Sequence, residues 1–359
     1  MNKHLLVCVS AHGFGHIAQV APVINTLRDL MPQLRVTVQT MASVAQLRAR
    51  MHGDFEYRQE GGDIGMVMAS ALDVQVRETA AAYARIHHDW EQTVAREADA
   101  LRAIAPDFVL SDVGYLPLAG AQLAGIPNVA MSSLNWADIV AHYCGAISGA
   151  QNIIEQMRRA YANADAFLQI TPHMPMHDLP NCIAFNPVAS VGRNRRAEIN
   201  KIFALRGDEK LVLVSLGGFD NRLPTEIWPR ISGVRWLLPM NWRSLHPDAL
   251  TLEAANMDFS DLLTSSDALL CKPGYGSFVE AACAALPVLT VARDDWPEAP
   301  YLEHWLATHG AMRKITRERM ERGEFSDELR DLLTAPRRPA VLPTGNHDVA
   351  EWLANRLGD

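Results

Sequence analysis

The feature that most constrains the fold is a doubled alternation of short apolar runs with longer stretches of helical periodicity. In the first half of the chain, the apolar runs predict strands at 4–10, 34–40, 54–58, 107–111, 127–132, 165–170 and 182–185. Helical patterns lie between them at 16–30, 43–51, 74–103, 116–124 and 136–162. This alternation is typical of parallel sheets whose strands are joined by helical crossovers.

The alternation starts afresh after Pro187. The second half predicts strands at 210–215, 234–239, 267–271, 287–292 and 311–315, and helices at 195–205, 223–230, 260–265, 275–285, 298–308 and 325–333. A last predicted helix, 346–357, follows the proline-rich loop "PRRPAVLPTGN". We therefore expect two doubly wound α/β domains, residues 1–187 and 188–345, with residues 346–359 packing back on the first domain. A chain of 359 residues is long enough for both.

The first predicted strand runs into a glycine- and histidine-rich turn, "SAHGFGHIAQ", at residues 10–19. Gly13, Gly15 and Ala18 match the dinucleotide-binding spacing G-x-G-x-x-A. That fingerprint also needs an acidic residue at the end of the second strand to hold a ribose diol, and the strand here ends Val-Gln-Thr at 38–40. We therefore do not expect nicotinamide binding at this turn, and a redox enzyme is an outside alternative. Close packing of helix on sheet would also explain the glycines.

The same turn places His12 and His16 at the carboxyl end of a strand, where α/β proteins keep their ligands. An imidazole titrates near neutral pH and suits a general base. Asp112, in "VLSDVG", ends another predicted strand and could orient His16. His12 is the alternative base. Simple capping of the following helices is the competing explanation for both His16 and Asp112.

A second glycine turn, "CKPGYGSFVEAACAALP", spans residues 271–287. Gly274 and Gly276 lie between a strand and a helix, so free backbone N–H groups and the positive helix end can bind an anion. Lys272 adds charge, Ser277 adds a hydroxyl, and Glu280 is the carboxylate expected for a ribose diol. A third pair, Gly217 and Gly218 in "VSLGGFDN", ends the first strand of the second half. A tight turn alone would also account for these glycines.

This second turn resembles the nucleotide-sugar segment of GT-B glycosyltransferases, which in the plant-type UDP-glycosyltransferases reads His-Cys-Gly-Trp-Asn-Ser-x-x-Glu. On that pattern Lys272 falls on the histidine and Tyr275 on the tryptophan, while Gly274, Ser277 and Glu280 fall on their own residue types. "GHIAQVAP" resembles the acceptor-side Gly-His-x-x-Pro turn, with its proline placed later. The resemblance implies a GT-B-like fold in which two Rossmann-like domains face each other across a cleft.

A nearer resemblance is to the GT-B-like N-terminal region of L-arabinokinase-type proteins. It is carried, in order, by "HGFGH", "SDVGYLPLAGAQLAGIPNVAMSSLNWADIVAHY", "KPGYGSFVEA" and "RDDWPEAPYL". The GHMP sugar-kinase half of those proteins, with its phosphate loop, does not follow here, so kinase activity is not expected. Transferases of this fold often carry an acid-glutamine pair near Glu298, but Ala299 follows it here.

The resemblance implies a set of roles for the site residues. His16 would be the base and Asp112 its orienting partner, with an acceptor side formed by His12, Gly13, Gly15 and Trp136. The nucleotide sugar would be bound by Gly217, Gly218, Lys272, Gly274, Tyr275, Gly276, Ser277, Glu280, Asp294, Asp295 and Glu298. Neither a metal nor a cofactor is expected beyond the nucleoside-diphosphate sugar, because a helix N-terminus and Lys272 can stabilise the leaving diphosphate.

Composition and charge limit the classes of binding partner and the compartment that we expect for this protein. The net charge is −8 and no basic run exceeds two residues, which argues against a nucleic-acid partner. No apolar run reaches the length of a membrane span. The five cysteines form no CxxC pair, and no signal peptide is recognisable, so we expect a cytoplasmic protein.

The sequence therefore predicts a metal-independent glycosyltransferase that moves a sugar, from a UDP-sugar in preference to other donors, to an unknown acceptor. A nucleotide-sugar hydrolase or epimerase on the same fold is one alternative, because function depends on the site and not the fold. A non-catalytic nucleotide- or sugar-binding protein is the other.

Overall fold

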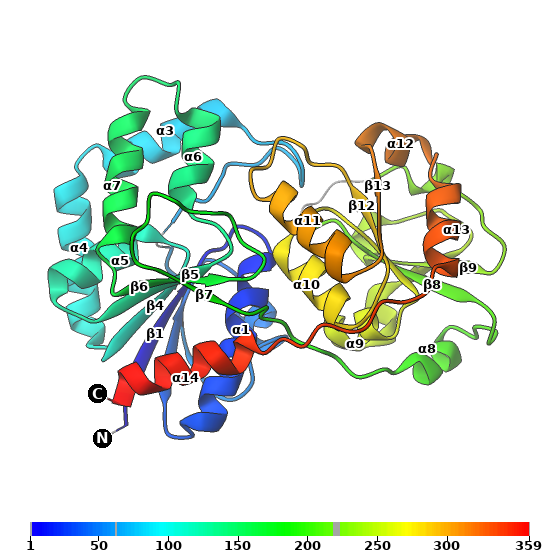
Figure 1. The fold of residues 1–359 in the computed structure, drawn as a ribbon, viewed down its shortest axis with the longest axis horizontal. Helices are drawn as coiled ribbons and strands as arrows, with labels where there is room; N and C mark the ends of the chain where they lie inside the picture. The colour runs from blue at the N-terminus through cyan, green and yellow to red at the C-terminus, as the bar shows by residue number, and fades with distance from the viewer. Residues whose placement is uncertain (1, 62, 218–222, 359) are drawn as a thin grey trace. The chain divides into compact units, whose positions relative to one another are not determined.

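The computed structural model describes residues 2–61, 63–217 and 223–358, and Figure 1 shows the chain as two α/β units. The N-terminal unit comprises Met1–Ala69, Asp73–Val188 and Pro343–Asp359. The C-terminal unit comprises Ser70–Leu72 and Ala189–Leu342. The chain thus leaves the first unit after Val188 and returns to it for its last helix.

The N-terminal unit is built on a seven-stranded parallel sheet of order β3-β2-β1-β4-β5-β6-β7. Its strands are β1 (His4–Val9), β2 (Arg35–Gln39), β3 (Glu56–Arg58), β4 (Phe108–Asp112), β5 (Asn128–Ser132), β6 (Ala166–Ile170) and β7 (Cys182–Phe185). Its helices are α1 (Gly15–Leu30), α2 (Val44–Arg48), α3 (Val76–His87), α4 (Trp90–Ile104), α5 (Tyr115–Ala124), α6 (Trp136–Cys144), α7 (Ala150–Ala162) and α14 (Gly345–Gly358).

Helix α14 packs beside α1 (Figure 1). Val349, Ala350 and Leu353 of α14 are wholly buried, as are Val20, Ile24 and Leu27 of α1. Residues three and four apart lie on one helix face, so each helix offers an apolar stripe that the other covers. The last helix of the chain therefore belongs to the core of the N-terminal unit.

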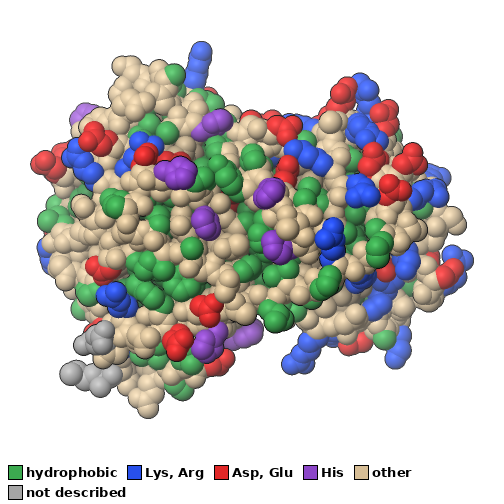
Figure 2. Space-filling model, viewed as in Figure 1, with side chains coloured by type: hydrophobic (Ala, Val, Ile, Leu, Met, Phe, Trp, Pro, Cys, Tyr) green, Lys and Arg blue, Asp and Glu red, His purple; other side chains and the backbone are tan. Residues whose placement is uncertain are grey.

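The C-terminal unit has a six-stranded parallel sheet of order β10-β9-β8-β11-β12-β13. Its strands are β8 (Lys210–Ser215), β9 (Val234–Leu238), β10 (Ala249–Thr251), β11 (Ala268–Cys271), β12 (Val288–Val291) and β13 (Met312–Ile315). Its α-helices are α8 (Arg196–Ile202), α9 (Phe259–Thr264), α10 (Tyr275–Cys283), α11 (Ala299–His309), α12 (Arg317–Arg322) and α13 (Ser326–Thr334). Trp228, Trp236 and Phe325 meet edge to face in its core. On the face shown in Figure 2, acidic and basic side chains are interspersed over this unit.

Three predicted helices need correction. The pattern at 74–103 is two helices, because Asp89 caps α4 by accepting a hydrogen bond from the Gln92 N–H. The pattern at 136–162 is also two, α6 and α7, since Gly149 between them has a φ of +84°. Residues 223–230 form only a 3₁₀ turn at Thr225–Ile227, because Pro229 disfavours helical backbone at the residue before it. Strand β10 and helix α12 were not among the predicted elements.

Candidate active site

The two sheets carry their candidate site residues at equivalent places. In each sheet the strand order reverses direction at one point, between β1 and β4 in the first and between β8 and β11 in the second. Open α/β sheets bind ligands beyond the carboxyl ends of the strands at this switch point. His16 and Asp112 follow or end β1 and β4, while Gly217 and Lys272 follow β8 and β11.

The His16–Asp112 pair lies at the first switch point. Val9 and Asp112 are partners in the β1–β4 register, and the turn after β1 leads directly into α1. His16 Nδ1 lies 2.9 Å from Asp112 Oδ1, and both side chains are buried. Burial raises the pKa of the Asp112 carboxyl to about 6, and the His16 ring opposes that rise. With its Nδ1–H donated to the carboxylate, the imidazole has its basic nitrogen at Nε2.

His12 differs from His16 in the hydrogen bond that its Nδ1 forms. Its Nδ1 accepts a hydrogen bond of 3.3 Å from the backbone N–H of Met66. Gly65 is packed against the ring, with a φ of +60°, and a Cβ there would lie 2.8 Å from His12 atoms. A neutral imidazole that accepts at Nδ1 carries its proton on Nε2. His12 is therefore arranged as a donor at Nε2, and the alternative assignment of His12 as the base is disfavoured by its hydrogen bonding.

Trp136 and a residue that sequence reasoning missed complete this cluster. Trp136 begins α6 and is fully buried, with its ring centroid 5.1 Å from that of His12 and 5.6 Å from that of His16. Its indole Nε1 donates to Asp63 Oδ2 over 2.6 Å. Asp63 lies in the segment "EGGDIG" after β3, and an acid in a glycine-rich loop that follows a strand was the only signal that could have found it.

The second switch point carries the anion site. Strand β11 leads through Lys272 and Gly274 into α10, a nine-residue helix with Gly274 at its N-cap. Backbone N–H groups of its first turn have no partner within the helix, which favours an anion there. Tyr275, Gly276 and Glu280 are buried, whereas Lys272, Gly274 and Ser277 are partly exposed. Gly217 has a φ of +89°, and Gly218 lies outside the described residues.

The segment after β12 contributes further charges to this part of the molecule. Burial and the Arg293 cation lower the pKa of the Lys272 ammonium to about 8, and Glu298 partly opposes them. The buried Arg293 guanidinium lies 3.9 Å from the Trp296 ring centroid, and the Trp296 indole donates to Glu298 Oε2 over 3.1 Å. The sequence-based site did not include Arg293.

Asp294 and Asp295 are placed differently from Glu298. Both are exposed, and Asp294 forms an ion pair of 2.6 Å with Lys314, which also contacts Glu303. Glu298 is buried at the N-cap of α11. Glu298 is thus buried and acts on the Lys272 charge, whereas the two aspartates are exposed.

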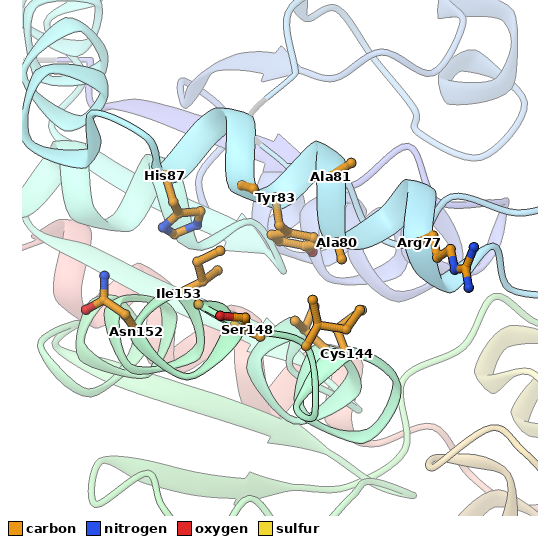
Figure 3. A pocket seen from close by; sticks show the side chains of 14 residues that line it. Arg77, Ala80, Ala81, Tyr83, His87, Cys144, Ser148, Asn152 and Ile153 are labelled. Carbon is orange, nitrogen blue, oxygen red and sulfur yellow. The ribbon is translucent and has the colours of Figure 1, made fainter.

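A separate cavity of about 480 Å³ lies in the N-terminal unit between α3, α6 and α7 (Figure 3). Its lining is mostly apolar, with Tyr83, Cys144 and Ile153 on its walls and His87 at one end. His87 is not a surface residue. The ring is buried because α3 packs on α7, and it forms hydrogen bonds of 2.7 Å to Gln156 of α7 and 2.8 Å to the Tyr115 hydroxyl of α5.

The described part of the chain has no group of three or more His, Cys, Asp or Glu side chains arranged to hold a metal ion. Among the same residues, no helix is both long and apolar enough to cross a membrane.

These two sheets, with their helices and the returning α14, make the GT-B fold. Solved structures of that fold cover nearly the whole chain. The spinosyn forosaminyltransferase SpnP matches all of both chains at 14% identity with a TM-score of 0.64. The calicheamicin glycosyltransferase CalG4 matches 100% of this chain and 99% of its own at 15% identity with a TM-score of 0.63. A UDP-N-acetylglucosamine 2-epimerase matches 100% and 97% at 14% identity with a TM-score of 0.57. The expected GT-B-like fold is confirmed.

Among curated proteins, the chain is similar to the L-arabinokinase of Arabidopsis thaliana, at 26% identity over 342 residues. The match takes in 91% of this chain, which spans about a third (32%) of the length of that relative. No family model matches the chain.

Proposed function

We propose that this protein is a glycosyltransferase that moves a sugar from a nucleoside-diphosphate sugar, a UDP-sugar in preference to others, to an acceptor hydroxyl without a metal ion. The observation that carries the proposal is the buried 2.9 Å hydrogen bond between His16 and Asp112 at the switch point of the first sheet. A base held by a carboxylate suits removal of a proton from a hydroxyl. The similarity of the fold to two glycosyltransferases supports the same reaction class.

In the proposed reaction, His16 Nε2 takes the proton of the acceptor hydroxyl as that oxygen forms a bond to the anomeric carbon of the donor. The bond from the anomeric carbon to the diphosphate oxygen breaks, and the electron pair leaves with the nucleoside diphosphate. Asp112 orients the His16 ring and stabilises the imidazolium that forms. The acceptor side is formed by Gly13, Gly15, Trp136 and His12. On this side His12 acts as a hydrogen-bond donor through its Nε2–H.

The donor half of the proposal rests on the α10 turn. Its N-terminal N–H groups, Lys272 and Ser277 would bind the diphosphate, with Gly274 and Gly276 allowing close approach. Glu280 would hold the ribose diol, and Glu298 the sugar. The remaining members of the proposed donor set are Gly217, Gly218, Tyr275, Asp294 and Asp295. The partners are then a small nucleotide sugar and an acceptor of unknown identity, with no nucleic acid. The five free cysteines support a reducing, cytoplasmic compartment.

A thermal-shift screen of nucleoside diphosphates tests the donor site. A nucleotide at about 100 times its dissociation constant should stabilise the fold by about 2.7 kcal/mol. Glu280→Ala should weaken UDP binding and leave inorganic diphosphate binding unchanged, because the diphosphate has no ribose. The exposed Glu351→Ala in α14 is the matched control. If no nucleotide stabilises the wild-type protein, the proposed donor site is wrong.

A second experiment separates the reaction classes. Radiolabelled nucleotide sugars are incubated with the protein, with and without cell extract. Label on an acceptor supports transfer. Free sugar or an epimerised nucleotide sugar supports a hydrolase or an epimerase, which the similarity to a UDP-N-acetylglucosamine 2-epimerase makes the second candidate. Binding without turnover would support a sensor.

A further inference from the structure

A second carboxylate, Asp63, lies beside the histidine cluster. Asp63 belongs to the loop between β3 and α3 and is partly buried. Its Oδ2 accepts a hydrogen bond of 2.6 Å from Trp136 Nε1, and the Ser10 hydroxyl donates to the same carboxylate. The carboxylate therefore ties three segments together: the end of β1, the loop before α3 and the first residue of α6.

The position of Trp136 matters because its ring contacts both histidines. The ring lies edge-on to His12 and tilted against His16, with centroids 5.1 and 5.6 Å apart. Its backbone N–H is also fixed, by a hydrogen bond of 3.3 Å to the Tyr161 hydroxyl. The Asp63–indole hydrogen bond adds a constraint on the side chain. A change at Asp63 would therefore alter the orientation of the Trp136 ring, which lies beside the His16 ring.

Asp63 also interacts with His16 electrostatically. Burial raises the pKa of Asp63, while the Ser10 hydrogen bond, the positive charge of His16 and the Trp136 hydrogen bond oppose the rise. Asp63 in turn raises the pKa of Asp112, so the two carboxylates interact. A protonated His16 offsets that repulsion, because its positive charge interacts favourably with both carboxylates. An asparagine would accept the same indole hydrogen bond without this charge.

We propose that Asp63 is a positioning residue for the His16 base: it holds the Trp136 indole beside the ring and supplies a second negative charge that stabilises the imidazolium formed when His16 takes the acceptor's proton. The role as a base rests on the proposed transferase function. The geometric and electrostatic link between Asp63 and His16 does not, and it is measurable in the protein without a substrate.

The groups that face His16 are known from each element around it. Asp112 comes from β4 and Asp63 from the β3–α3 loop, while His12, in the β1–α1 turn, contacts the same Trp136 ring as His16. Burial raises the pKa values of Tyr83, Tyr115 and Tyr161 well above their ordinary range, and Asp63 adds to each shift. These tyrosines therefore stay neutral near pH 7, and the charge at His16 responds to the two carboxylates.

The test is a histidine-ring NMR titration of the full chain, with the His16 signal assigned by its loss in His16→Gln. Asp63→Asn should lower the titration midpoint of His16 by about 1 pH unit, because one neighbouring negative charge is removed. It should also shift the indole N–H signal of Trp136. Asp138→Asn is the matched control, because Asp138 is a carboxylate in the first turn of the same helix, paired with Arg158. It should leave the His16 midpoint unchanged.

Trp136→Phe separates anchoring from charge, since it removes the indole N–H and keeps the carboxylate. The titration midpoint of His16 in Trp136→Phe should therefore stay close to that of the wild-type protein. Coupling is reciprocal, so His16→Gln should raise the titration midpoint of Asp63, followed by carboxyl-carbon NMR. This second measurement holds even if Asp63→Asn fails to fold. An unchanged His16 midpoint in Asp63→Asn, or an unchanged Asp63 midpoint in His16→Gln, overturns the inference.

Activity distinguishes this inference from the proposed function. If the wild-type protein transfers or releases sugar, Asp63→Asn should shift the acidic limb of the pH–rate profile in the same direction as the His16 midpoint. If the NMR coupling is present and no nucleotide sugar reacts, the proposed function fails and the Asp63–His16 link stands. If sugar is transferred and the coupling is absent, only the role of Asp63 is wrong.

Discussion

His16 Nδ1 lies 2.9 Å from Asp112 Oδ1 across the point where the first sheet reverses its strand order. The two residues are 96 positions apart in the chain. The pairing of Val9 with Asp112 in the parallel β1–β4 register brings the end of β4 beside the turn from which α1 starts. A buried imidazole with a carboxylate on one nitrogen has the other nitrogen available for proton transfer chemistry.

Removing the imidazole tests its role as base. His16→Ala should lower the rate of sugar transfer by at least about 100-fold, because loss of a general base typically costs 10²–10⁴-fold. Nucleotide affinity, measured by calorimetry, should stay nearly unchanged because the donor residues belong to the other unit. His12→Ala should cost less, since His12 is held as a donor. Wild-type rates in His16→Ala would contradict the assignment and return His12 as the base.

Asp112→Asn tests the orienting carboxylate. The amide oxygen can still accept the Nδ1–H of His16, but it brings no charge to stabilise the imidazolium. Turnover should therefore fall by less than in His16→Ala, with little change in the Michaelis constant for the donor. Steady-state kinetics of both variants under one set of conditions decide the order. A larger loss in Asp112→Asn than in His16→Ala would show that the carboxylate does more than orient the ring.

The low pKa of Lys272, about 8, predicts a pH dependence of nucleotide binding. The ammonium is mostly charged at pH 7 and loses its proton as the pH rises through 8. UDP affinity should therefore decline above pH 8 in the wild-type protein. Lys272→Arg keeps its charge at these pH values and should retain its affinity from pH 7 to pH 9. Calorimetric titrations at several pH values measure both. Parallel profiles for the two proteins would place Lys272 away from the phosphates.

The lowered pKa of Lys272 also predicts how the free energy of unfolding changes with pH. The pKa of Lys272 is lower in the folded protein (about 8) than in the unfolded chain (10.5), so the charged form destabilises the fold below pH 8. Stability should rise with pH between 8 and 10.5 as this cost disappears. Lys272→Met should raise the free energy of unfolding at pH 7 by about 3 kcal/mol, and the gain should vanish near pH 10.5. Urea denaturation across this range measures the difference, and a pH-independent gain would reject the cause.

Packing of α14 on α1 predicts the cost of a core truncation. Leu353 is wholly buried, and Leu353→Ala should lower the free energy of unfolding by about 2–5 kcal/mol. Asn355→Ala, on the exposed side of the same helix, should change it by less than about 0.5 kcal/mol. Denaturant unfolding followed by circular dichroism compares them. Equal stability of the two variants would mean that α14 does not contribute to the core.

The features that the sequence predicted best are those that depend on a local pattern of residues. Apolar runs and glycine turns placed every strand of the two sheets except β10, because a buried parallel strand reads as a short apolar run between turn residues. The breaks between α3 and α4 and between α6 and α7 were missed. A capping aspartate and a left-handed glycine interrupt otherwise continuous helical periodicity there.

The amino-acid sequence by itself determined the parallel α/β architecture, the strand–glycine–helix turns, and which residues stand at the ends of strands. These depend on side-chain periodicity and backbone freedom over a few neighbouring residues. Only the tertiary structure decided that the Asp63 carboxylate bonds Trp136, 73 residues away, and that His87 is buried on Tyr115. It also decided that His12 accepts at Nδ1 from Met66 while His16 lies against Asp112. Hydrogen bonds between distant segments are set by sheet register and helix packing, which no local pattern encodes.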